Sequence, residues 1–344
     1  MVANPFQPSP SDHSVLIIAE AGLNHNGSVT IAKQMIDVAA RCGVDAVKFQ
    51  KRTVATLAIR EVLDAEDRRF PEFGSTYRQI REHLELDWDA YVTLKAYTES
   101  NGLTFICTGF DPEAIDFLDR LGVPIFKLAS HSLTNLDLLH HVADKGRPVI
   151  LSTGMAEWDE LDRAVAILNQ GPLALLHCVS AYPTPVEQCN LSMISLLKER
   201  YRLTVGYSGH EMGYLPSVAA VAMGAKIIER HFTLDCRMTG FDHKISLEPD
   251  ALAAMVRDIR QVEAMHGHGE KRVSDQERIT RNKYHVSMAS VRPLRAGERL
   301  TREMIAWTNP GTGIPAKEAD RWLGKTLAMD VPGDVLIQPE MFAS

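Results

Sequence analysis

The sequence predicts an α/β fold, an eight-fold (β/α) TIM barrel followed by a small β-rich domain. Eight short apolar runs recur between residues 15 and 234, and a segment with helical spacing separates each run from the next. Nearly every run ends at a polar residue, and large apolar residues become scarce after Met265. This alternation is typical of a parallel barrel, whose catalytic face lies at the C-terminal ends of its strands.

Apolar runs mark the predicted strands, at residues 15–22, 46–50, 103–109, 125–130, 148–154, 173–179, 203–209 and 225–234. Helical spacing marks the predicted helices, at residues 29–42, 89–101, 112–121, 133–143, 158–169, 191–201, 214–223 and 249–265. Ser28 and Gly43, on either side of the first helix, are residue types that favour helix ends. Residues 52–86 are too long and too charged for an ordinary connection, so we expect a lid or substrate loop.

The chain divides into four predicted parts. Residues 1–13 form a flexible Pro-rich lead-in, 14–265 the barrel, 266–283 a polar linker and 284–344 the small domain. Within the small domain, residues 294–304 resemble residues 331–341, because both place a Gly-acid turn before an apolar residue and end in Glu and Met. This similarity predicts a pseudo-symmetric β-rich unit with a limited core of its own.

Charge and composition argue against several classes of function. Lys and Arg total 37 against 44 Asp and Glu, which gives a net charge of −7 and no basic block to attract nucleic acid. No apolar run is long enough to span a membrane, and the first residues lack the pattern of a secretory signal. The five cysteines form no CxxC pair, which favours reduced thiols in a cytoplasmic protein.

Two lysines indicate the chemistry of the predicted catalytic face. Lys48 and Lys127 lie near the C-terminal ends of apolar runs, where a charged amine is costly unless an anion or an acid compensates it. Together they would form an anion clamp, with hydroxyl donors from Thr108, Ser130, Ser152, Thr153, Ser180 and Ser208. The alternative is that one lysine forms a Schiff base, as in aldolases of this fold.

Two histidines are expected at one rim of the barrel, because His210 follows the seventh run and His231 lies at the end of the eighth. A pair of imidazoles with acidic neighbours suits a divalent metal. For either histidine alone, the alternative is a hydrogen-bonded structural role. His25 is expected to touch substrate from the first βα loop, and we assign the following histidines to the surface: His140, His141, His266 and His268.

Two carboxylates are candidates for acid and base catalysis. Glu20 lies at the end of the first run, and Asp242 lies in the loop after the eighth. A carboxylate in a partly closed cavity can be tuned to transfer a proton near neutral pH. Glu20 has the alternative of an ion pair with one of the lysines, and both roles are compatible. Glu229 is a further candidate neighbour for the metal.

Eight motifs, in the family's order, carry a resemblance to the sialic acid synthase family. They are AEAGLNHNG (19–27), VKFQ (47–50), FKLAS (126–130), LSTGM (151–155), LHCVSAYPTP (176–185), GYSGHE (206–211), ERHFTLD (229–235) and GFDHKISLEP (240–249). The tail after residue 284 resembles the antifreeze-like (SAF, β-clip) domain of those synthases. The resemblance runs from about residue 15 to the C-terminus.

The resemblance implies a transferase that condenses phosphoenolpyruvate with an open-chain amino-sugar aldehyde, N-acetylmannosamine or a relative, to give a sialic-type acid and phosphate. It implies a divalent metal, Mn²⁺ or Mg²⁺, held by His210 and His231, which polarises the aldehyde oxygen. By the same resemblance, the catalytic residues are Glu20, Asp242 and His231. The substrate-binding residues that it implies are Lys48, Thr108, Lys127, Ser130, Ser152, Ser180, Tyr182 and Ser208.

Departures from the family pattern concern the acceptor sugar. Ser132 replaces a usual Glu, and Asn309 stands where bacterial members use an Arg. Gly209 and Ser180 resemble the animal enzymes, which take a sugar 6-phosphate. The identity of the acceptor sugar therefore stays open. The candidates are N-acetylmannosamine, its 6-phosphate, a 6-deoxy diacetamido hexose of the legionaminic or pseudaminic type, and a less common aldose.

Two other classes of function are alternatives. One is a sugar-binding or assembly protein that keeps the fold without turnover, against which the retained lysines and histidines argue. The other is a lyase or aldolase with a Schiff-base lysine. Borohydride with substrate would trap that adduct, whereas a chelator should inhibit a metal-dependent synthase.

In the family, each antifreeze-like domain covers the partner's barrel mouth, and the polar linker of this chain permits such a swap. We therefore expect a domain-swapped homodimer and predict that residues 1–283 alone lose most of the activity. Sedimentation and turnover of this fragment, compared with the full chain, test the prediction. Full activity of the fragment would contradict it.

Overall fold

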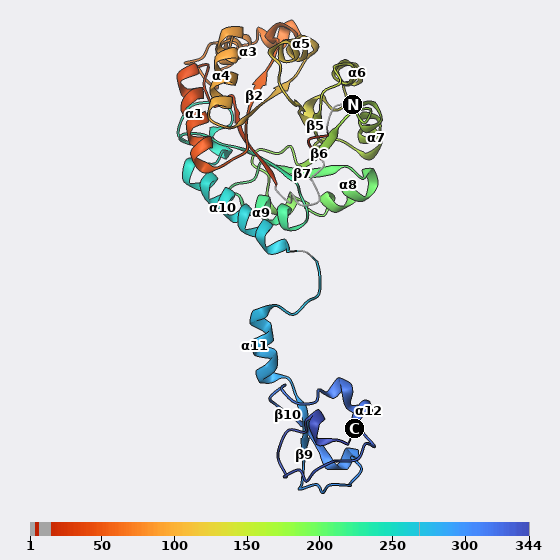
Figure 1. The fold of residues 1–344 in the computed structure, drawn as a ribbon. Helices are drawn as coiled ribbons and strands as arrows, with labels where there is room; N and C mark the ends of the chain where they lie inside the picture. The colour runs from red at the N-terminus through yellow and green to blue at the C-terminus, as the bar shows by residue number, and fades with distance from the viewer. Residues whose placement is uncertain (1–3, 7–14, 268, 344) are drawn as a thin grey trace. The chain divides into compact units, whose positions relative to one another are not determined.

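The computed structural model describes residues 4–6, 15–267 and 269–343. These residues divide into two compact units, Met1–Gly267 and His268–Ser344 (Figure 1). The division between the units falls inside the predicted linker of residues 266–283. His268, which we assigned to the surface, lies outside the described residues, as does most of the predicted lead-in.

The first unit is a closed parallel barrel in which each strand pairs with the next and β8 closes on β1, so the predicted fold is confirmed. Figure 1 shows the strands inside a ring of helices. The strands are β1 (Leu16–Gly22), β2 (Ala46–Lys51), β3 (Thr104–Gly109), β4 (Phe126–Leu128), β5 (Val149–Ser152), β6 (Leu173–Cys178), β7 (Thr204–Gly209) and β8 (Ile227–His231). All eight lie within one residue of a predicted run or inside it.

The helices of this unit are α1 (Val29–Cys42), α2 (Arg60–Leu63), α3 (Tyr77–Leu84), α4 (Trp88–Ser100), α5 (Pro112–Leu121), α6 (Leu136–Asp144), α7 (Trp158–Leu168), α8 (Met193–Tyr201), α9 (Leu215–Ala222) and α10 (Pro249–His266). The caps of α1 are as predicted: the Ser28 side chain accepts from the backbone N–H of Ile31, and Gly43 has a φ of 80°.

The structure corrects the predicted boundary between β4 and α6. The strand ends at Leu128 rather than at residue 130, because Ser130–Ser132 form a short 3₁₀ turn, η2. The helix begins at Leu136 rather than at residue 133, because Asn135 caps it through the backbone N–H of Leu138. Ser130 consequently lies on a turn above the strand.

The connection after β2 contains η1 (Val54–Thr56), α2 and α3. The Thr76 side chain caps α3 through the backbone N–H of Gln79, and Ile80 and Leu84 are buried on its inner side. Ile80 and Leu84 pack with Leu23 in a small cluster of their own. The predicted lid segment is therefore folded and attached to the barrel.

Phe6 corrects the prediction of a flexible lead-in for the described residues 4–6. Its side chain is buried in an apolar cluster with Ile18, Ala46 and Ile227, residues near the starts of their strands. The hydroxyl of Thr204, the first residue of β7, donates to the Phe6 carbonyl at 2.8 Å. Phe6 therefore closes the barrel at the end opposite to its predicted catalytic face.

The second unit has an antiparallel pair, β9 (Ser287–Ser290) and β10 (Ile305–Thr308), around a core that includes Met288, Trp322 and Ile337. The two similar stretches run against each other, since Leu294 and Val331 exchange backbone hydrogen bonds of 2.8 and 2.9 Å. Each stretch ends in a 3₁₀ turn, η5 (Arg302–Met304) or η7 (Pro339–Met341). The two stretches therefore pair with each other and end in the same kind of turn, while their pseudo-symmetry stays a prediction. The remaining short elements are η6 (Ala316–Glu318) and α12 (Ala319–Trp322).

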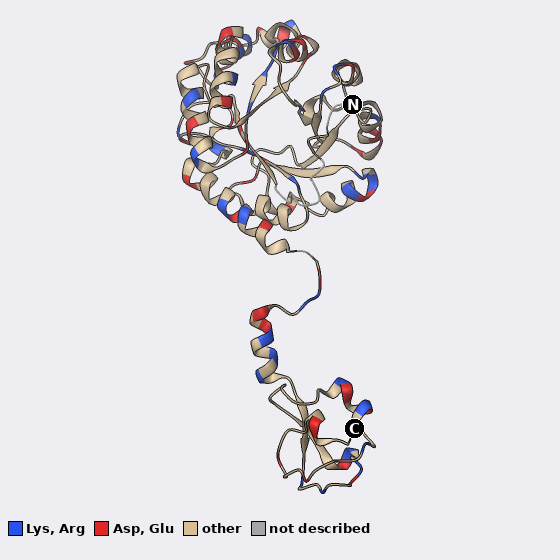
Figure 2. Cartoon of the chain, viewed as in Figure 1, with Lys and Arg blue, Asp and Glu red and all other residues tan. Residues whose placement is uncertain are grey.

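A helix, α11 (Asp275–Tyr284), occupies much of the segment that we predicted to be a linker. Ser274 and Glu277 form a capping box at its start, and none of its residues is buried. Acidic residues lie in its first turn and basic residues in its last, as Figure 2 shows, which suits the helix dipole. Sequence analysis missed this helix because it has no apolar face.

The position of Phe6 predicts a cost for its removal. We expect Phe6→Ala to lower the free energy of unfolding by about 3 kcal/mol, because it leaves a cavity in a packed cluster. Urea denaturation measures the change. Tyr284→Ala, at an exposed aromatic position, is the matched control and should alter stability by less than about 0.5 kcal/mol. Equal effects of the two substitutions would contradict a packed Phe6.

Candidate functional site

A cavity of about 290 Å³ lies at the C-terminal ends of the barrel strands. Every residue predicted for the site lines it: Glu20, Lys48, Thr108, Lys127, Ser130, Ser152, Ser180, Tyr182, Ser208, His210, His231 and Asp242. They come from all eight strands or the loops that follow them. The structure therefore brings these residues together, whereas their individual roles stay predictions.

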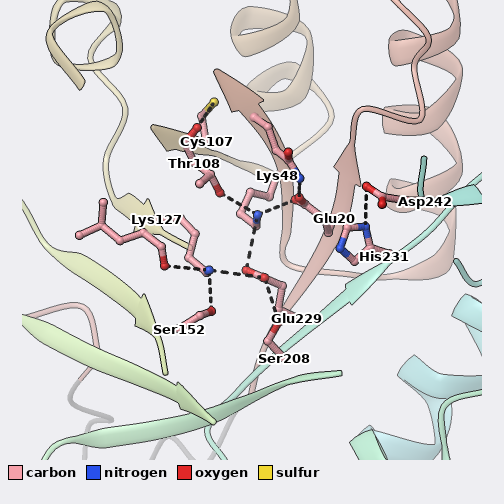
Figure 3. Close-up of polar contacts among 12 residues, drawn as sticks. Glu20, Lys48, Cys107, Thr108, Lys127, Ser152, Ser208, Glu229, His231 and Asp242 are labelled. Carbon is pink, nitrogen blue, oxygen red and sulfur yellow. Dashed lines mark hydrogen bonds and ion pairs between the residues drawn. The ribbon is translucent and has the colours of Figure 1, made fainter. Parts of the chain in front are cut away.

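Both predicted lysines are buried against carboxylates at the base of this cavity (Figure 3). The Lys48 Nζ lies 2.7 Å from the Glu20 Oε2 and 3.8 Å from the Glu229 Oε2. The Lys127 Nζ lies 3.6 Å from the Glu229 Oε1. Glu229 therefore bridges the two ammonium groups, and the ion pair that we considered for Glu20 is present.

Hydroxyl groups complete this cluster. The Lys48 Nζ donates to the Thr108 Oγ1 at 2.9 Å, and the Lys127 Nζ donates to the Ser152 Oγ at 2.7 Å. The Ser208 hydroxyl donates to Glu229 at 3.1 Å. Thr108 and Ser152 each retain a hydrogen that they can donate to a bound anion, because they accept from the lysines.

The charged groups in this cluster shift one another's pKa values. Burial alone would lower the pKa of Lys48, but the carboxylates of Glu20 and Glu229 outweigh burial and raise it. Burial prevails at Lys127, whose pKa is lowered although Glu229 opposes the shift. Burial would raise the pKa of Glu229, but Lys127 and Lys48 hold it below its ordinary value. Glu229 therefore stays ionised between the two amines.

The two predicted metal ligands face each other at the same rim. The His210 and His231 ring centroids lie 5.6 Å apart, and the Tyr182 ring lies 4.2 Å from that of His210. The Nδ1 of His210 lies 3.0 Å from the carbonyl oxygen of Val179. Because a carbonyl only accepts, the Nδ1 of the neutral ring carries the hydrogen and Nε2 keeps its lone pair.

The donor set fits a divalent metal. Burial, and next the nearby His231, lower the pKa of His210 to about 3, so that its imidazole is neutral. The His231 Nδ1 is buried without a hydrogen-bond partner and lies 3.7 Å from the Asp242 Oδ2. Within the described parts of the chain, no group of three ligating side chains is present. A metal here would therefore rest on two imidazoles and take its other ligands from water or substrate.

A buried ion pair braces the two histidines. Arg230, which precedes His231, pairs with Glu211, which follows His210, and both side chains are almost fully buried. The Arg230 guanidinium also donates to the carbonyl oxygens of Glu211 and Gly213, at 2.8 and 2.6 Å. These contacts fix the loop after β7 to β8 next to both imidazoles.

Three residues named in the sequence analysis differ from their expected roles or positions. His25 is fully buried beside Phe49, does not line the cavity, and accepts from the backbone N–H of Gly27. The expected contact of His25 with substrate is therefore not supported. Thr153 donates to the carbonyl of Leu176 and does not line the cavity. Glu229 contacts the lysines rather than serving mainly as a neighbour of the metal site.

The sequence analysis missed several residues that line the cavity: Gln50, Arg52, Arg81, Phe110, His131, Met155 and Phe241. Gln50 lies two residues after Lys48 on β2, so the alternation of side chains along a strand was an available signal for it, and Arg52 follows the strand. Arg81 lies on α3, and its approach to the cavity depends on how the lid segment folds. No pattern in the sequence indicates that approach.

Comparisons with known proteins give consistent matches. A model described as the NeuB family matches residues 35–271, and a model of the SAF domain matches residues 286–343. An N,N'-diacetyllegionaminic acid synthase of Campylobacter jejuni is 38% identical to this chain, over 94% of the chain and 98% of the relative. An N-acetylneuraminate-9-phosphate synthase of Homo sapiens is 37% identical, over 96% and 93%.

A solved structure of a sialic acid synthetase is also similar to this chain. It is an N-acetylneuraminic acid (sialic acid) synthetase from Leptospira borgpetersenii, in complex with citrate, with a TM-score of 0.69 and 36% sequence identity. The match covers 78% of this chain and 91% of that chain.

The brace between the histidines predicts the effect of a side chain at Gly209. A Cβ there would lie 2.5 Å from the Arg230 Nη1 and 2.6 Å from the Glu211 Oε2. We expect Gly209→Ala to lower the free energy of unfolding by about 1–3 kcal/mol, because the buried ion pair must move. Chemical denaturation measures it. Gly171→Ala, where a Cβ meets open space, should be nearly neutral, and an equally neutral Gly209→Ala would contradict the brace.

Proposed function

Because this chain belongs to the NeuB family, we propose that it is a nonulosonic acid synthase that condenses phosphoenolpyruvate with an open-chain amino-sugar aldehyde. One observation carries the proposal. Two buried lysines, Lys48 and Lys127, pair with Glu229 in the same cavity in which two histidine rings face each other. An enzyme of this kind must hold a highly charged anion close to a polarised aldehyde. The cavity contains groups suited to both tasks.

The lysine cluster supports binding of phosphoenolpyruvate. Lys48 and Lys127 supply two ammonium groups, and each already donates to a hydroxyl oxygen. The hydroxyls near them belong to Thr108, Ser130, Ser152 and Ser208. Charge-assisted hydrogen bonds to phosphate and carboxylate oxygens are among the strongest in proteins. In the proposed complex the substrate oxygens compete with Glu20 and Glu229 for the two amines. Binding would therefore exchange lysine–carboxylate contacts for lysine–substrate contacts.

The reaction joins carbon 3 of phosphoenolpyruvate to the aldehyde carbon. Water adds at carbon 2, and the resulting tetrahedral intermediate expels phosphate. The aldehyde oxygen gains a proton and the attacking water loses one. Asp242, beside His231, and Glu20, at the end of β1, are the carboxylates in the cavity that we propose to manage these protons.

His210 and His231 would hold Mn²⁺ or Mg²⁺, which supplies Lewis-acid polarisation of the aldehyde oxygen when it is bound. The Tyr182 ring packs on His210 and limits how that imidazole can turn. The Val179 carbonyl fixes the tautomer of His210. These neighbours preorganise the imidazole pair.

The acceptor is proposed to be N-acetylmannosamine or a relative. Relatives that make different acids, as their names state, are similarly distant from this chain, at 37–38% identity. A sugar 6-phosphate and a 6-deoxy diacetamido hexose are therefore the alternatives. Ser132, the last residue of the turn that carries Ser130 and His131, is buried, and it supplies no carboxylate at that position.

The Schiff-base alternative has one feature in its favour, because burial lowers the pKa of Lys127. Its surroundings argue for an ammonium group instead. The Lys127 Nζ donates to Ser152 and to the carbonyl of Leu128, and it faces Glu229. An amine with three acceptors around it has no lone pair directed at substrate. A sugar-binding protein without turnover would not need this cluster.

The assembly and location that we expect also stay proposals. We infer a homodimer from the family resemblance, with the truncation of residues 284–344 as its test. Cytoplasmic location rests on composition and on cysteine usage, and all five cysteines are free. No helix within the described residues has the length and apolarity to cross a membrane.

The proposed function predicts phosphate release from phosphoenolpyruvate with Mn²⁺ and an aldose acceptor, with the keto-acid product identified by mass. Chelation should abolish release, borohydride should not, and Lys127→Met should lower turnover at least roughly a hundredfold, because it removes a charge-assisted contact. Lys145→Met, at a surface ion pair, is the control. If no acceptor gives phosphate release and phosphoenolpyruvate does not bind, the proposal is overturned. If no acceptor gives phosphate release but phosphoenolpyruvate binds, the acceptor is an unusual one.

A further inference from the structure

Two arginines line the cavity without a carboxylate partner. Arg52 follows β2, and Arg81 lies on α3 of the lid segment. Neither forms an ion pair with any described acidic residue, although the cavity also contains Asp242 and Glu20. A buried or half-buried guanidinium without a counter-ion is costly, so this pair needs an explanation that the lysine cluster does not provide.

The Arg52 side chain is held in place but not satisfied. It is 8% exposed, its Nη2 donates to the Gln50 Oε1 at 2.6 Å, and its guanidinium carbon lies 3.8 Å from the Phe110 ring centroid. Its Nη1 is buried with no hydrogen-bond partner. Burial, and next the charge of Arg81, lower the pKa of Arg52 to about 10. Its orientation is fixed by neutral groups, and one edge is left free to donate.

Arg81 is arranged in a similar way. Its guanidinium carbon lies 4.3 Å from the Phe241 ring centroid and 5.0 Å from that of Tyr77. Its Nε is buried without a partner. Cation–π contacts orient the plane of a guanidinium without neutralising its charge. Two like charges are thus held close to each other in one cavity.

The nearby carboxylates have other partners. Glu85 lies 2.8 Å from the Lys51 Nζ, and Asp242 lies 3.7 Å from the His231 Nδ1. Glu20 is 2.7 Å from the Lys48 Nζ. The charge of the arginine pair is therefore left for a ligand.

We propose that Arg52 and Arg81 form an oxyanion subsite for a phosphate monoester on the acceptor sugar, at the end remote from its aldehyde. This inference rests on the proposed function and specifies the acceptor class left open there. A planar guanidinium donates two parallel hydrogen bonds to a phosphate, which a neutral hydroxymethyl or methyl group cannot accept in the same way.

The position of the pair favours the acceptor over phosphoenolpyruvate as the source of the phosphate. Arg52 contacts Gln50, and Gln50 donates to Glu20 at 2.6 Å, so two side chains separate Arg52 from Lys48. Arg81 rests on Phe241, whose neighbour Asp242 lies beside His231. Phe241 and Asp242 thus separate Arg81 from His231, so the arginine pair lies on the histidine side of the cavity but apart from the imidazoles, where the aldehyde is proposed to bind.

The test compares N-acetylmannosamine with its 6-phosphate, using the full chain, Mn²⁺ and saturating phosphoenolpyruvate. We expect the wild type to prefer the phosphorylated acceptor, and Arg81→Gln and Arg52→Gln to lower kcat/KM for it at least roughly tenfold, mainly through KM. The KM for phosphoenolpyruvate and the activity with any unphosphorylated acceptor should be nearly unchanged. Arg60→Gln, at a 92% exposed side chain of the same lid segment, is the matched control.

Three outcomes would overturn the subsite. They are no preference for the phosphorylated acceptor in the wild type, equal losses with both acceptors, and a rise confined to the KM for phosphoenolpyruvate. The last outcome would assign the arginines to the other substrate. Arg81 is only half-buried, so Arg81→Gln remains informative if the Arg52 variant does not fold.

A binding measurement separates failure of this inference from failure of the proposed function. 2-Acetamido-2-deoxymannitol and its 6-phosphate have no aldehyde and cannot react, so calorimetry with both compounds does not depend on turnover. Tighter binding of the phosphate, lost in Arg81→Gln, would support the subsite even if no acceptor is converted. Equal binding of the two compounds would overturn it even if the enzyme proves to be a synthase.

Discussion

The site depends on Glu229 lying between Lys48 and Lys127. Two ammonium groups buried at one barrel mouth would repel each other, and neither could stay charged without a carboxylate within reach. Glu229 meets both, and Glu20 adds a second negative charge on the side of Lys48. The barrel makes this arrangement possible, because β1, β2, β4 and β8 direct their C-terminal side chains into a common space.

The fold and most of the candidate site could be predicted from the sequence because one physical rule governs both. Apolar runs that end in polar residues give the strands and, in a parallel barrel, also the residues of the catalytic face. Lys48, Lys127, His210 and His231 were found in this way. Which side chains become partners depends on distances between strands, so the sequence analysis named Glu229 only as a candidate neighbour of the metal and did not identify its contacts with the lysines.

Other features had no such signal. Phe6 contacts residues far along the chain, so a Pro-rich segment gave no indication that it closes the barrel floor. Helix α11 has local capping but no apolar stripe, and periodicity therefore missed it. Arg81 reaches the cavity because α3 packs on Leu23, the residue after β1, through Ile80 and Leu84. These features do not follow from the periodicity of apolar residues in the sequence, and the positions of Phe6 and Arg81 depend on contacts between residues distant in the chain.

The brace between Arg230 and Glu211 has a consequence for how this sequence can change over time. Gly209 leaves the space that the guanidinium fills, so any larger residue at position 209 competes directly with Arg230 for the same volume. Losing Arg230 alone would strand a buried carboxylate. A larger residue at position 209 is therefore compatible with this fold only if the ion pair changes with it, so the effects of substitutions at the three positions are not independent.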